Sequence, residues 1–559
     1  MRAARFGPSP ALYVTAMTAR ISEAAATGAG GRARVVFGSS AIGVDEVVAL
    51  AEGRAGAALS GDPHWLARLE AGRALLQSRL ADGEPVYGVS TGVGASVGNK
   101  IPENLQADLA RNLFRFHGCG TGRPLPAQEA AAVVAARLAS LARGYSAVRP
   151  LVLEYLVALL EHGVLPRIPE EGSVGASGDL TPLAYLAALL AGEGEALVGG
   201  ETLPAREALA KAGLAPLELA PKESLALMNG TSVMAGIAAL VVVRAERLAH
   251  LAAAVTAMTS AATIGNPEHF DDGILSLKPH PGTIAVGAWI RAFLGNARPA
   301  DPPSRLQDRY SVRCAPHVLG VLVDAAVLAR RILDVEIAGV NDNPVVDPDT
   351  GRVLHGGNFY GGHVVFAVDA LKGAMAGAAD LLDRQLVLLC MPETSGGLAA
   401  NLVASPDGHS VSHHGFKAMQ ITASALAAEA AKTSLPAAVF SRSTESHNQD
   451  QVSMGTLAAR EARRVVELGE TVGAIVLLAA CQAVDLRLRG GGSLPKPVMR
   501  LHAAVRARVP MLDRDRRQDG DIAAVLELLR EDLLPLRPAE AVPPADSTPV
   551  RGGRQARSA

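Results

Sequence analysis

Residues 172–183 read Gly-Ser-Val-Gly-Ala-Ser-Gly-Asp-Leu-Thr-Pro-Leu. Small residues make this stretch a tight turn, and Asp179 is placed to cap a helix that begins at Leu180 or Thr181. The tripeptide Ala176–Gly178 carries little weight alone, because a chain rich in alanine and glycine contains about one Ala-Ser-Gly by chance. Its meaning depends on what surrounds it in the rest of the chain.

The composition indicates a large hydrophobic core and no strongly charged partner. Of 559 residues, 49% are hydrophobic and 19% are charged, which excludes bulk disorder. The 53 basic and 55 acidic residues give a net charge of -2, so neither nucleic acid nor an anionic membrane is expected as a partner. Aromatic residues are only 3% of the chain, and abundant alanine favours helices over a β-rich fold.

The cysteines and the apolar runs bear on where the protein works. The four cysteines lie far apart and form no CxxC pair, which argues against a disulfide framework or a thiolate metal site. The uninterrupted apolar runs are shorter than the roughly 18 residues of a membrane span. The N-terminus lacks the pattern of a secretory signal. We therefore expect a cytoplasmic protein that needs no metal; its cysteines are Cys119, Cys314, Cys390 and Cys481.

Helical periodicity dominates the body of the chain. Pro150 suits the first turn of a helix that ends before Gly163. The longer helical segments predict a mainly α fold with a bundle of long antiparallel helices at 233–262, 316–338, 362–390, 418–434 and 455–487. Composition further predicts a flexible extension at 1–34 and a disordered tail at 537–559.

Glycine-rich polar stretches lie between these helices, where sites are commonly built on a rigid scaffold. They include Tyr87-Gly-Val-Ser-Thr-Gly-Val-Gly94, Met228-Asn-Gly-Thr231, Gln307-Asp-Arg-Tyr-Ser-Val-Arg313, Asn341-Asp-Asn-Pro344 and His355-Gly-Gly-Asn-Phe359. With 172–183, these motifs follow one another as in the aromatic amino acid ammonia-lyase family, which the chain resembles from about residue 35 to 535. That family contains histidine, phenylalanine and tyrosine ammonia-lyases and related aminomutases.

The resemblance implies a prosthetic group made from the chain itself. Ala176, Ser177 and Gly178 would cyclise to 4-methylidene-imidazole-5-one (MIO), the family's electrophile. The residue types suit this chemistry, because the amide nitrogen of Gly178 must reach the Ala176 carbonyl and only an unhindered backbone allows that approach. Loss of water from Ser177 then creates an alkene that serves as an electron sink.

The resemblance also assigns roles to residues of the other motifs. Tyr87 occupies the position of the base that removes the β-proton, so the site must stabilise a phenolate. Arg313 would bind the substrate carboxylate through its guanidinium fork. Tyr310 and Gln307 would form hydrogen bonds around cofactor and substrate. Asn229 would donate to an oxygen of the cofactor ring.

Four further positions have weaker roles by the same comparison. Phe359 would pack near the cofactor, with Asn358 as a nearby polar contact. Asn341 and Asn343, in the Asn-Asp-Asn-Pro turn, are expected mainly to support the architecture.

The choice of substrate is less clear from the sequence. In the family, selectivity is associated with the pair that falls here at Phe116–His117, and this pair matches none of the common patterns: Phe-Leu for phenylalanine, His-Leu for tyrosine and Ser-His for histidine. Gln449 stands where histidine lyases place a glutamate, and a neutral amide does not replace that charge. His117 either bonds a para-hydroxyl of the substrate or is satisfied by backbone carbonyls.

We therefore expect elimination of ammonia from L-tyrosine or L-phenylalanine, giving p-coumarate or cinnamate. The alternatives are a histidine ammonia-lyase giving urocanate, an aromatic 2,3-aminomutase, and an inactive helical scaffold. The resemblance implies an ammonia-lyase/fumarase-like architecture, with a cofactor-bearing domain at 35–225 and a long-helix bundle at 226–536. It also implies a homotetramer in which Tyr87 and Phe359 reach a cofactor on another subunit.

Overall fold

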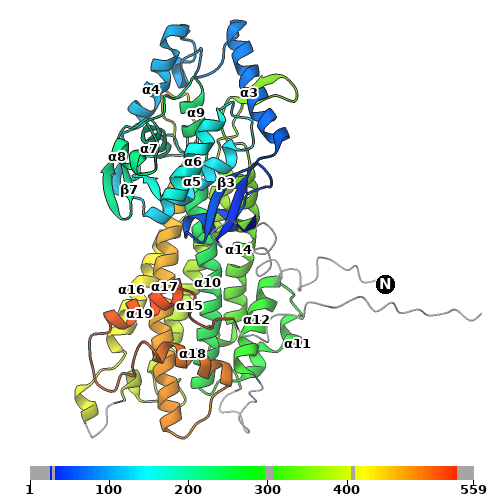
Figure 1. Ribbon diagram of the computed structural model, residues 1–559. Coiled ribbons are helices and arrows are strands. Elements are labelled where there is room, and N and C mark those ends of the chain that lie inside the picture. Colours follow the sequence, from blue (N-terminus) through cyan, green and yellow to red (C-terminus); the bar gives the residue numbers. More distant parts are fainter. Residues whose placement is uncertain (1–25, 28–31, 296–305, 405–408, 538–559) are drawn as a thin grey trace, which may run out of the picture.

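The computed structural model describes residues 26–27, 32–295, 306–404 and 409–537. Most of the expected extension at 1–34, and all but the first residue of the expected tail at 537–559, lie outside these residues. The fold is mainly helical and elongated, with a bundle of long helices at one end (Figure 1). The expected fold class is therefore confirmed.

The bundle reproduces the helices predicted from periodicity to within two residues at each end. Its helices are α10 (Ser232–Ala262), α12 (Pro281–Leu294), α14 (Ala315–Ala338), α15 (Gly362–Cys390), α16 (Lys417–Thr433) and α17 (Gly455–Arg489). Helices α10, α14, α15 and α17 pack against one another along much of their lengths. The short helices α11 (Asp272–Leu275) and α13 (Tyr310–Arg313), together with α18 (Lys496–Arg506) and α19 (Asp519–Arg530), lie on the bundle.

Helix α17 is long and apolar enough to cross a membrane by length and composition alone. In the structure, 72% of its most apolar stretch is buried inside the protein, mainly against α10, α15 and α16. A core helix passes the same test. The sequence analysis counted only uninterrupted apolar runs and therefore did not single this helix out.

The other end of the molecule is built from shorter helices and loops (Figure 1). These helices are α2 (Val44–Ala51), α3 (Pro63–Ala81), α4 (Gln106–His117), α5 (Ala127–Leu141), α6 (Pro150–His162), α7 (Leu180–Leu190), α8 (Ala205–Lys211) and α9 (Glu223–Met228). Helix α6 begins at Pro150 and ends at Gly163, whose φ of 62° is left-handed, as its sequence predicts.

The strands are few and short. They are β1 (Ala26–Thr27), β2 (Ala33–Phe37), β3 (Ala55–Leu59), β4 (Thr121–Pro124), β5 (Val164–Pro166), β6 (Pro169–Glu171), β7 (Glu195–Val198), β8 (Glu201–Pro204), β9 (Val345–Asp347) and β10 (Arg352–Leu354). They form sheets of order β1-β2-β3, β5-β7-β8, β4-β6 and β10-β9, and β2 pairs with β3 in parallel while the other pairs are antiparallel. Within the stretch expected to form a flexible extension, Ala26 and Thr27 of β1 pair with Arg34 and Ala33 of β2.

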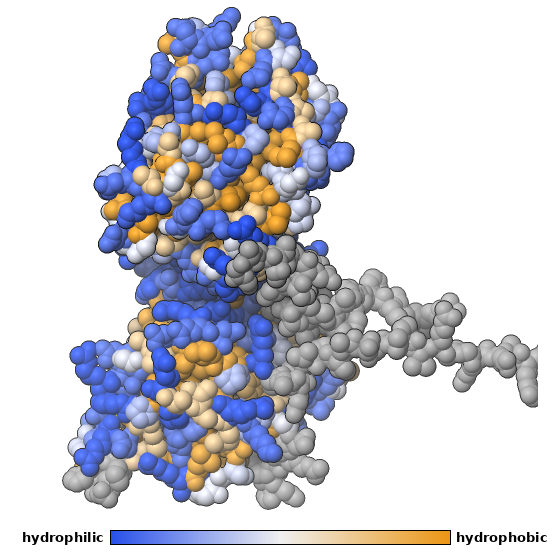
Figure 2. Space-filling model, in the orientation of Figure 1, coloured by the Kyte–Doolittle hydropathy of each residue, from blue (hydrophilic) through white to orange (hydrophobic). Residues whose placement is uncertain are grey.

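The hydrophobic core is continuous along the molecule. One cluster of buried side chains extends from Val35 in β2 to Leu536, through α5, α7, α10 and α17. The predicted division into domains at residue 225 therefore stays a prediction. Apolar residues also reach the surface over both ends of the molecule, on the face drawn in Figure 2. Exposed examples from the bundle helices are Val321, Val335, Phe366 and Ile421.

Candidate active site

A cavity of about 690 Å³ lies where the predicted loops come together. Its walls come from the loop at 87–101, the end of α4, the turn before α7, the end of α9 and the loops at 343–359 and 445–451. Eight of the predicted site residues line it: Tyr87, Phe116, His117, Ala176, Ser177, Asn229, Phe359 and Gln449. Segments far apart in the sequence thus form one site.

The tripeptide predicted to cyclise is held against the turn that follows α9. Gly178 has a left-handed φ of +71°, and a Cβ at this position would lie 2.1 Å from the carbonyl oxygen of Gly230. Gly178 also forms isolated β-bridges with Ala176 and with Gly230. Only glycine fits such a close backbone approach. The segment therefore has the compact backbone that cyclisation needs.

Two side-chain amides donate hydrogen bonds to the central serine of this tripeptide. Asn229 Nδ2 lies 2.8 Å from the carbonyl oxygen of Ser177, and Gln449 Nε2 lies 3.2 Å from its Oγ. Asn229 is 3% exposed, and its Oδ1 has no hydrogen-bond partner among the described residues. Buried polar atoms usually have a hydrogen-bond partner, so the unpaired Oδ1 leaves room for a partner that forms when the tripeptide cyclises. These residues therefore fit the expected prosthetic group.

Asp179 does not cap its own helix, which corrects the sequence-based prediction. Its buried carboxylate turns to α10 instead, where Oδ2 accepts from the backbone N–H groups of Val233 and Met234 at 3.0 and 2.9 Å. Oδ1 accepts from the hydroxyls of Ser173 and Thr456. Burial raises the pKa of Asp179 to about 6, although these hydrogen bonds favour the charged form. The carboxylate thus joins the cofactor loop to the starts of α10 and α17.

Tyr87 lies in the cavity with its hydroxyl oxygen held by the backbone. Its Oη accepts a hydrogen bond from the N–H of Gly94 at 2.8 Å. Burial raises the pKa of Tyr87, the Gly94 hydrogen bond opposes this rise, and the nearby Glu445 carboxylate adds to it. Among the described residues, the Gly94 hydrogen bond is the contact that favours a phenolate, and burial together with the Glu445 carboxylate outweighs it.

Glu445 is a site residue that the sequence analysis missed. Its carboxylate accepts from the N–H of Ala95 at 3.0 and 3.1 Å, and it lines the cavity with Asp450. Both residues belong to the same segment as Gln449. The segment is a loop without periodicity, so its sequence does not predict which side chains point into the cavity. The cavity therefore contains acidic side chains although Gln449 is neutral.

The selectivity pair at the end of α4 also faces the cavity. His117 Nδ1 lies 2.9 Å from the carbonyl oxygen of Leu113, and a carbonyl can only accept, so Nδ1 carries the proton. Burial lowers the pKa of His117, which favours the neutral ring. Its Nε2 is then a hydrogen-bond acceptor. The ring stacks on Phe116 with centroids 4.1 Å apart, and Phe116 itself is 56% exposed.

The loop at 341–359 closes another side of the site. Phe359 and Asn343 line the cavity, and Asn343 Oδ1 accepts from the N–H of Gly356 at 2.8 Å. Asn358 Nδ2 donates to the carbonyl oxygen of Val340 at 3.1 Å, and Asn341 Nδ2 donates to that of Glu336 at 3.0 Å. These amides hold the loop together, in agreement with a supporting role.

The residues expected to bind the carboxylate lie elsewhere. Gln307, Tyr310 and Arg313 precede α14, whereas the cavity lies near its other end; 24 helical residues span about 36 Å. Arg313 Nε donates to the carbonyl oxygen of Asp308 at 3.1 Å, and its guanidinium lies 4.5 Å from the ring centroid of Tyr310, which is 72% exposed. Tyr87 and Phe359 instead line the same chain's cavity as Ser177, contrary to the expectation that they serve another subunit.

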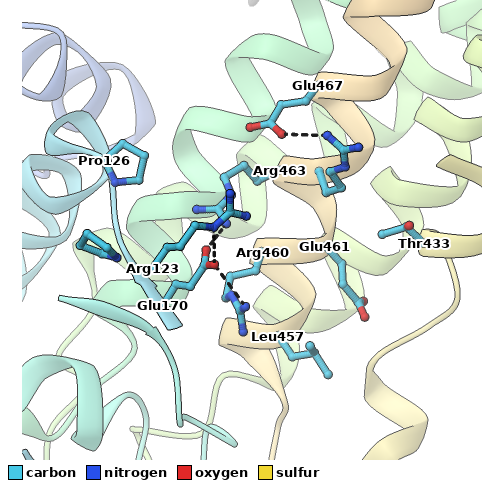
Figure 3. A pocket seen from close by; sticks show the side chains of 11 residues that line it. Arg123, Pro126, Glu170, Thr433, Leu457, Arg460, Glu461, Arg463 and Glu467 are labelled. Atoms are coloured by element: carbon cyan, nitrogen blue, oxygen red, sulfur yellow. Dashed lines mark hydrogen bonds and ion pairs between the residues drawn. The ribbon is translucent and has the colours of Figure 1, made fainter. Parts of the chain in front are cut away.

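A second cavity, of about 700 Å³, differs in chemistry. Figure 3 shows Glu170 with Arg123, Arg460 and Arg463 around it, and each arginine forms an ion pair with Glu170. None of the predicted site residues lines this second cavity. Over the described part of the chain, no cluster of side chains is suited to holding a metal ion.

The helix bundle and the compact tripeptide beside side-chain amides define a class of enzyme: lyases whose electrophile is built from their own backbone. Comparison with known proteins agrees. The model of the aromatic amino acid lyase family matches residues 42–507, so the chain belongs to this family.

Similar proteins fall within the same group. A histidine ammonia-lyase of Anaeromyxobacter sp. (strain K) is 42% identical over 88% of this chain and 98% of its own. Among solved structures, histidine ammonia-lyase from Trypanosoma cruzi has a TM-score of 0.82 at 33% identity, covering 91% of this chain and 96% of that chain. Tyrosine aminomutase from Streptomyces globisporus has a TM-score of 0.83 at 35% identity, covering 89% of this chain and 97% of that chain.

Family membership establishes the reaction class and the cofactor. The protein is a carbon–nitrogen lyase, and its prosthetic group is 4-methylidene-imidazole-5-one formed from Ala176, Ser177 and Gly178. When formed, this group supplies an electrophilic alkene. The residues around this group bind and orient the substrate and transfer its protons.

Proposed function

We propose that the protein is a histidine ammonia-lyase, which eliminates ammonia from L-histidine to give urocanate. The observation that carries this proposal is the 2.9 Å contact between His117 Nδ1 and the carbonyl oxygen of Leu113. Because Nδ1 is bound to the Leu113 carbonyl, Nε2 offers an acceptor to a substrate ring that carries a donor. The imidazole N–H of histidine meets this requirement, and the phenyl ring of phenylalanine does not.

Two further features support histidine over the sequence-based choice of tyrosine or phenylalanine. Glu445 and Asp450 give the cavity acidic character, which suits an imidazole ring. Gln449 therefore need not supply that charge. In addition, curated relatives that this chain matches over nearly their whole length carry the name histidine ammonia-lyase, among them one of Gloeobacter violaceus.

L-Tyrosine is the second candidate, because its phenol hydroxyl could also donate to His117 Nε2. Gln449 and the aromatic ring of Phe116 favour it, since a neutral amide and an aromatic neighbour suit a phenol ring. The product would be p-coumarate, or a β-amino acid if ammonia is added back before release, as the similarity to a tyrosine aminomutase suggests.

Proton removal in this proposal belongs to Tyr87, whose Oη lies in the cavity with Ser177. Asn229 and Gln449 orient the serine-derived part of the site through their amide donors. Arg313 and Tyr310 would have to come from another copy of the chain, since their own position is at the far end of α14. The proposal thus includes a homotetramer with shared sites. It also places the protein in the cytoplasm, which four unpaired thiols support.

The test offers L-histidine, L-tyrosine and L-phenylalanine separately to purified protein and follows ammonia and ultraviolet absorption of the arylacrylate. We expect urocanate to form fastest and Ser177→Ala to be inactive. His117→Leu should lower turnover of histidine more than that of phenylalanine. Equal losses of turnover on both substrates would refute the role of His117. If p-coumarate or a β-amino acid were the main product, tyrosine would replace histidine as the proposed substrate.

Sharing of the site has its own test. Ser177→Ala and Arg313→Met chains should each be inactive alone. If Arg313 acts in a site formed with another copy, co-expression of the two should restore part of the activity, because some mixed assemblies contain one intact site. Absence of any restored activity, with mixed assemblies present, would contradict sharing.

A further inference from the structure

Arg137 of α5 lies directly beneath the cofactor-forming segment and has no assigned role. It is among the largest fully buried side chains, with 0% exposure. Its Nη1 donates to the carbonyl oxygen of Asn229 at 2.9 Å, and its Nη2 donates to Ser140 Oγ at 3.2 Å. Its Nε has no hydrogen-bond partner among the described residues.

This environment is costly for a guanidinium. Arg244, Arg330 and Arg463 each pair with at least one carboxylate, whereas the described contacts of Arg137 are to a carbonyl and a hydroxyl. Burial lowers the pKa of Arg137 to about 10, and the charges of Asp342 and Asp179 act on it without an ion pair. A buried charge without a directly paired carboxylate lowers the stability of the fold. We therefore looked for a role of Arg137 in the groups that it contacts.

The contact that explains it is the one with the Asn229–Gly230 turn. A Cβ at Gly230 would lie 2.0 Å from Arg137 Nη1, so the guanidinium packs directly against this glycine. On its other side, the Gly230 carbonyl oxygen crowds Gly178 and accepts from the N–H of Asp179 at 2.7 Å. Gly230 is therefore held between Arg137 and the segment that cyclises.

We propose that Arg137 is a positioning residue for formation of the prosthetic group: it holds the Asn229–Gly230 turn against Ala176–Gly178 so that the segment keeps its compact conformation. Cyclisation forms a bond from the Gly178 nitrogen to the Ala176 carbonyl carbon. The carbonyl oxygen leaves as water with the protons of the Gly178 and Ser177 nitrogens, leaving a C=N bond. Ser177 then loses its α-hydrogen and its hydroxyl as a second water.

The contacts of Arg137 act on the geometry of the cyclising segment and not only on the stability of the fold. Asn229 Nδ2 and the Gly230 carbonyl both contact the cyclising segment, and the guanidinium fixes the peptide between them from below. A side chain at position 137 that is too short to reach the Asn229 carbonyl, or that has no donor, leaves this oxygen without its hydrogen bond and opens space behind Gly230. The turn can then relax away from Gly178, and the two reacting backbone atoms separate.

The experiment measures cofactor formation by intact mass of the purified full-length protein, with Ser177→Ala as the uncyclised reference. Wild-type chains should be lighter than the encoded chain by the mass of two water molecules. Arg137→Gln should leave most of the folded chain at the encoded mass, and Arg137→Lys, which keeps a donor, should recover a larger fraction of dehydrated chain. Arg330→Lys, at a partly buried ion pair with Glu246 that does not line the cavity, is the matched control and should be fully dehydrated.

Ser140→Ala is a second variant that tests the proposal even if the Arg137 variants do not fold. It removes the hydroxyl that orients Nη2 but keeps the guanidinium, and it should slow dehydration during a time course after synthesis. Complete loss of both waters at the wild-type rate in Ser140→Ala, or in folded Arg137→Gln, would overturn the proposal. A lower unfolding temperature with complete dehydration would show that Arg137 only stabilises the fold. The outcome does not depend on which amino acid is the substrate.

Discussion

The buried ion pair between Lys222 and Asp342 gives the sharpest stability prediction. Both side chains are 0% exposed, and Nζ lies 2.6 Å from Oδ2. Asp342 Oδ1 also accepts from Ser146 Oγ at 3.1 Å. The pair joins the start of α9, which leads to Asn229, to the Asn-Asp-Asn-Pro turn beside the cavity. Replacing Lys222 with Met or Asp342 with Leu removes one charge and leaves its partner buried.

The expected cost follows from this complete burial. Removing one partner of a buried ion pair costs about 3–5 kcal/mol, because the remaining charge has no compensation. Asp342→Leu additionally leaves the Ser146 hydroxyl unsatisfied, which adds about 1 kcal/mol. Replacing both partners together removes both charges, so the double variant should lose much less than the sum of the single losses.

The assay is urea unfolding of the wild type, Lys222→Met, Asp342→Leu and the double variant. All samples need one protein concentration, since coupling to self-association makes the midpoint depend on concentration. Both single variants should unfold at clearly lower urea, and the double variant should recover most of the difference. Single losses below about 0.5 kcal/mol, the level of ordinary surface changes, would refute the reasoning. So would a double variant that loses the full sum, because additivity means no coupling.

Three further predictions concern the site and its surroundings. Tyr87→Phe keeps the ring but removes the base, so kcat should fall by about 10²–10⁴ while the circular dichroism spectrum stays unchanged. Because the Glu445 carboxylate raises the pKa of Tyr87 and the base must be deprotonated, Glu445→Gln should move the rising limb of the pH profile of kcat/KM to lower pH; a shift to higher pH would contradict this. The pKa of Asp179 is raised from 3.8 to about 6, so the folded state binds a proton more readily than the unfolded state, and stability should decrease by about 3 kcal/mol as pH rises through this window. Asp179→Asn, whose amide can donate to the hydroxyls of Ser173 and Thr456, should flatten that decrease in urea midpoints measured from pH 4 to 7.

The sequence predicted reliably those features that depend on residues close together in the chain, namely the helices and their ends. Apolar periodicity located α10, α14, α15, α16 and α17 to within two residues, because the helical repeat is written into neighbouring positions. Pro150 and Gly163 marked the two ends of α6, since each residue restricts or frees its own backbone. The substrate was harder to predict: the neutral Gln449 suggested tyrosine or phenylalanine, while Glu445, in the same loop, supplies acidic character that no local pattern revealed.

The order of residues was enough to predict the helical class, the family and the cofactor. Apolar periodicity indicates the helices, the ordered motifs indicate the family, and the cofactor needs Ala176, Ser177 and Gly178 next to one another. Which residues meet in space depends instead on the tertiary structure. It turned Asp179 from its own helix to the starts of α10 and α17, placed Arg137 beneath Gly230, and left Arg313 at the far end of α14. These outcomes depend on contacts between residues far apart in the chain, and such contacts form only when the bundle brings its helix ends together.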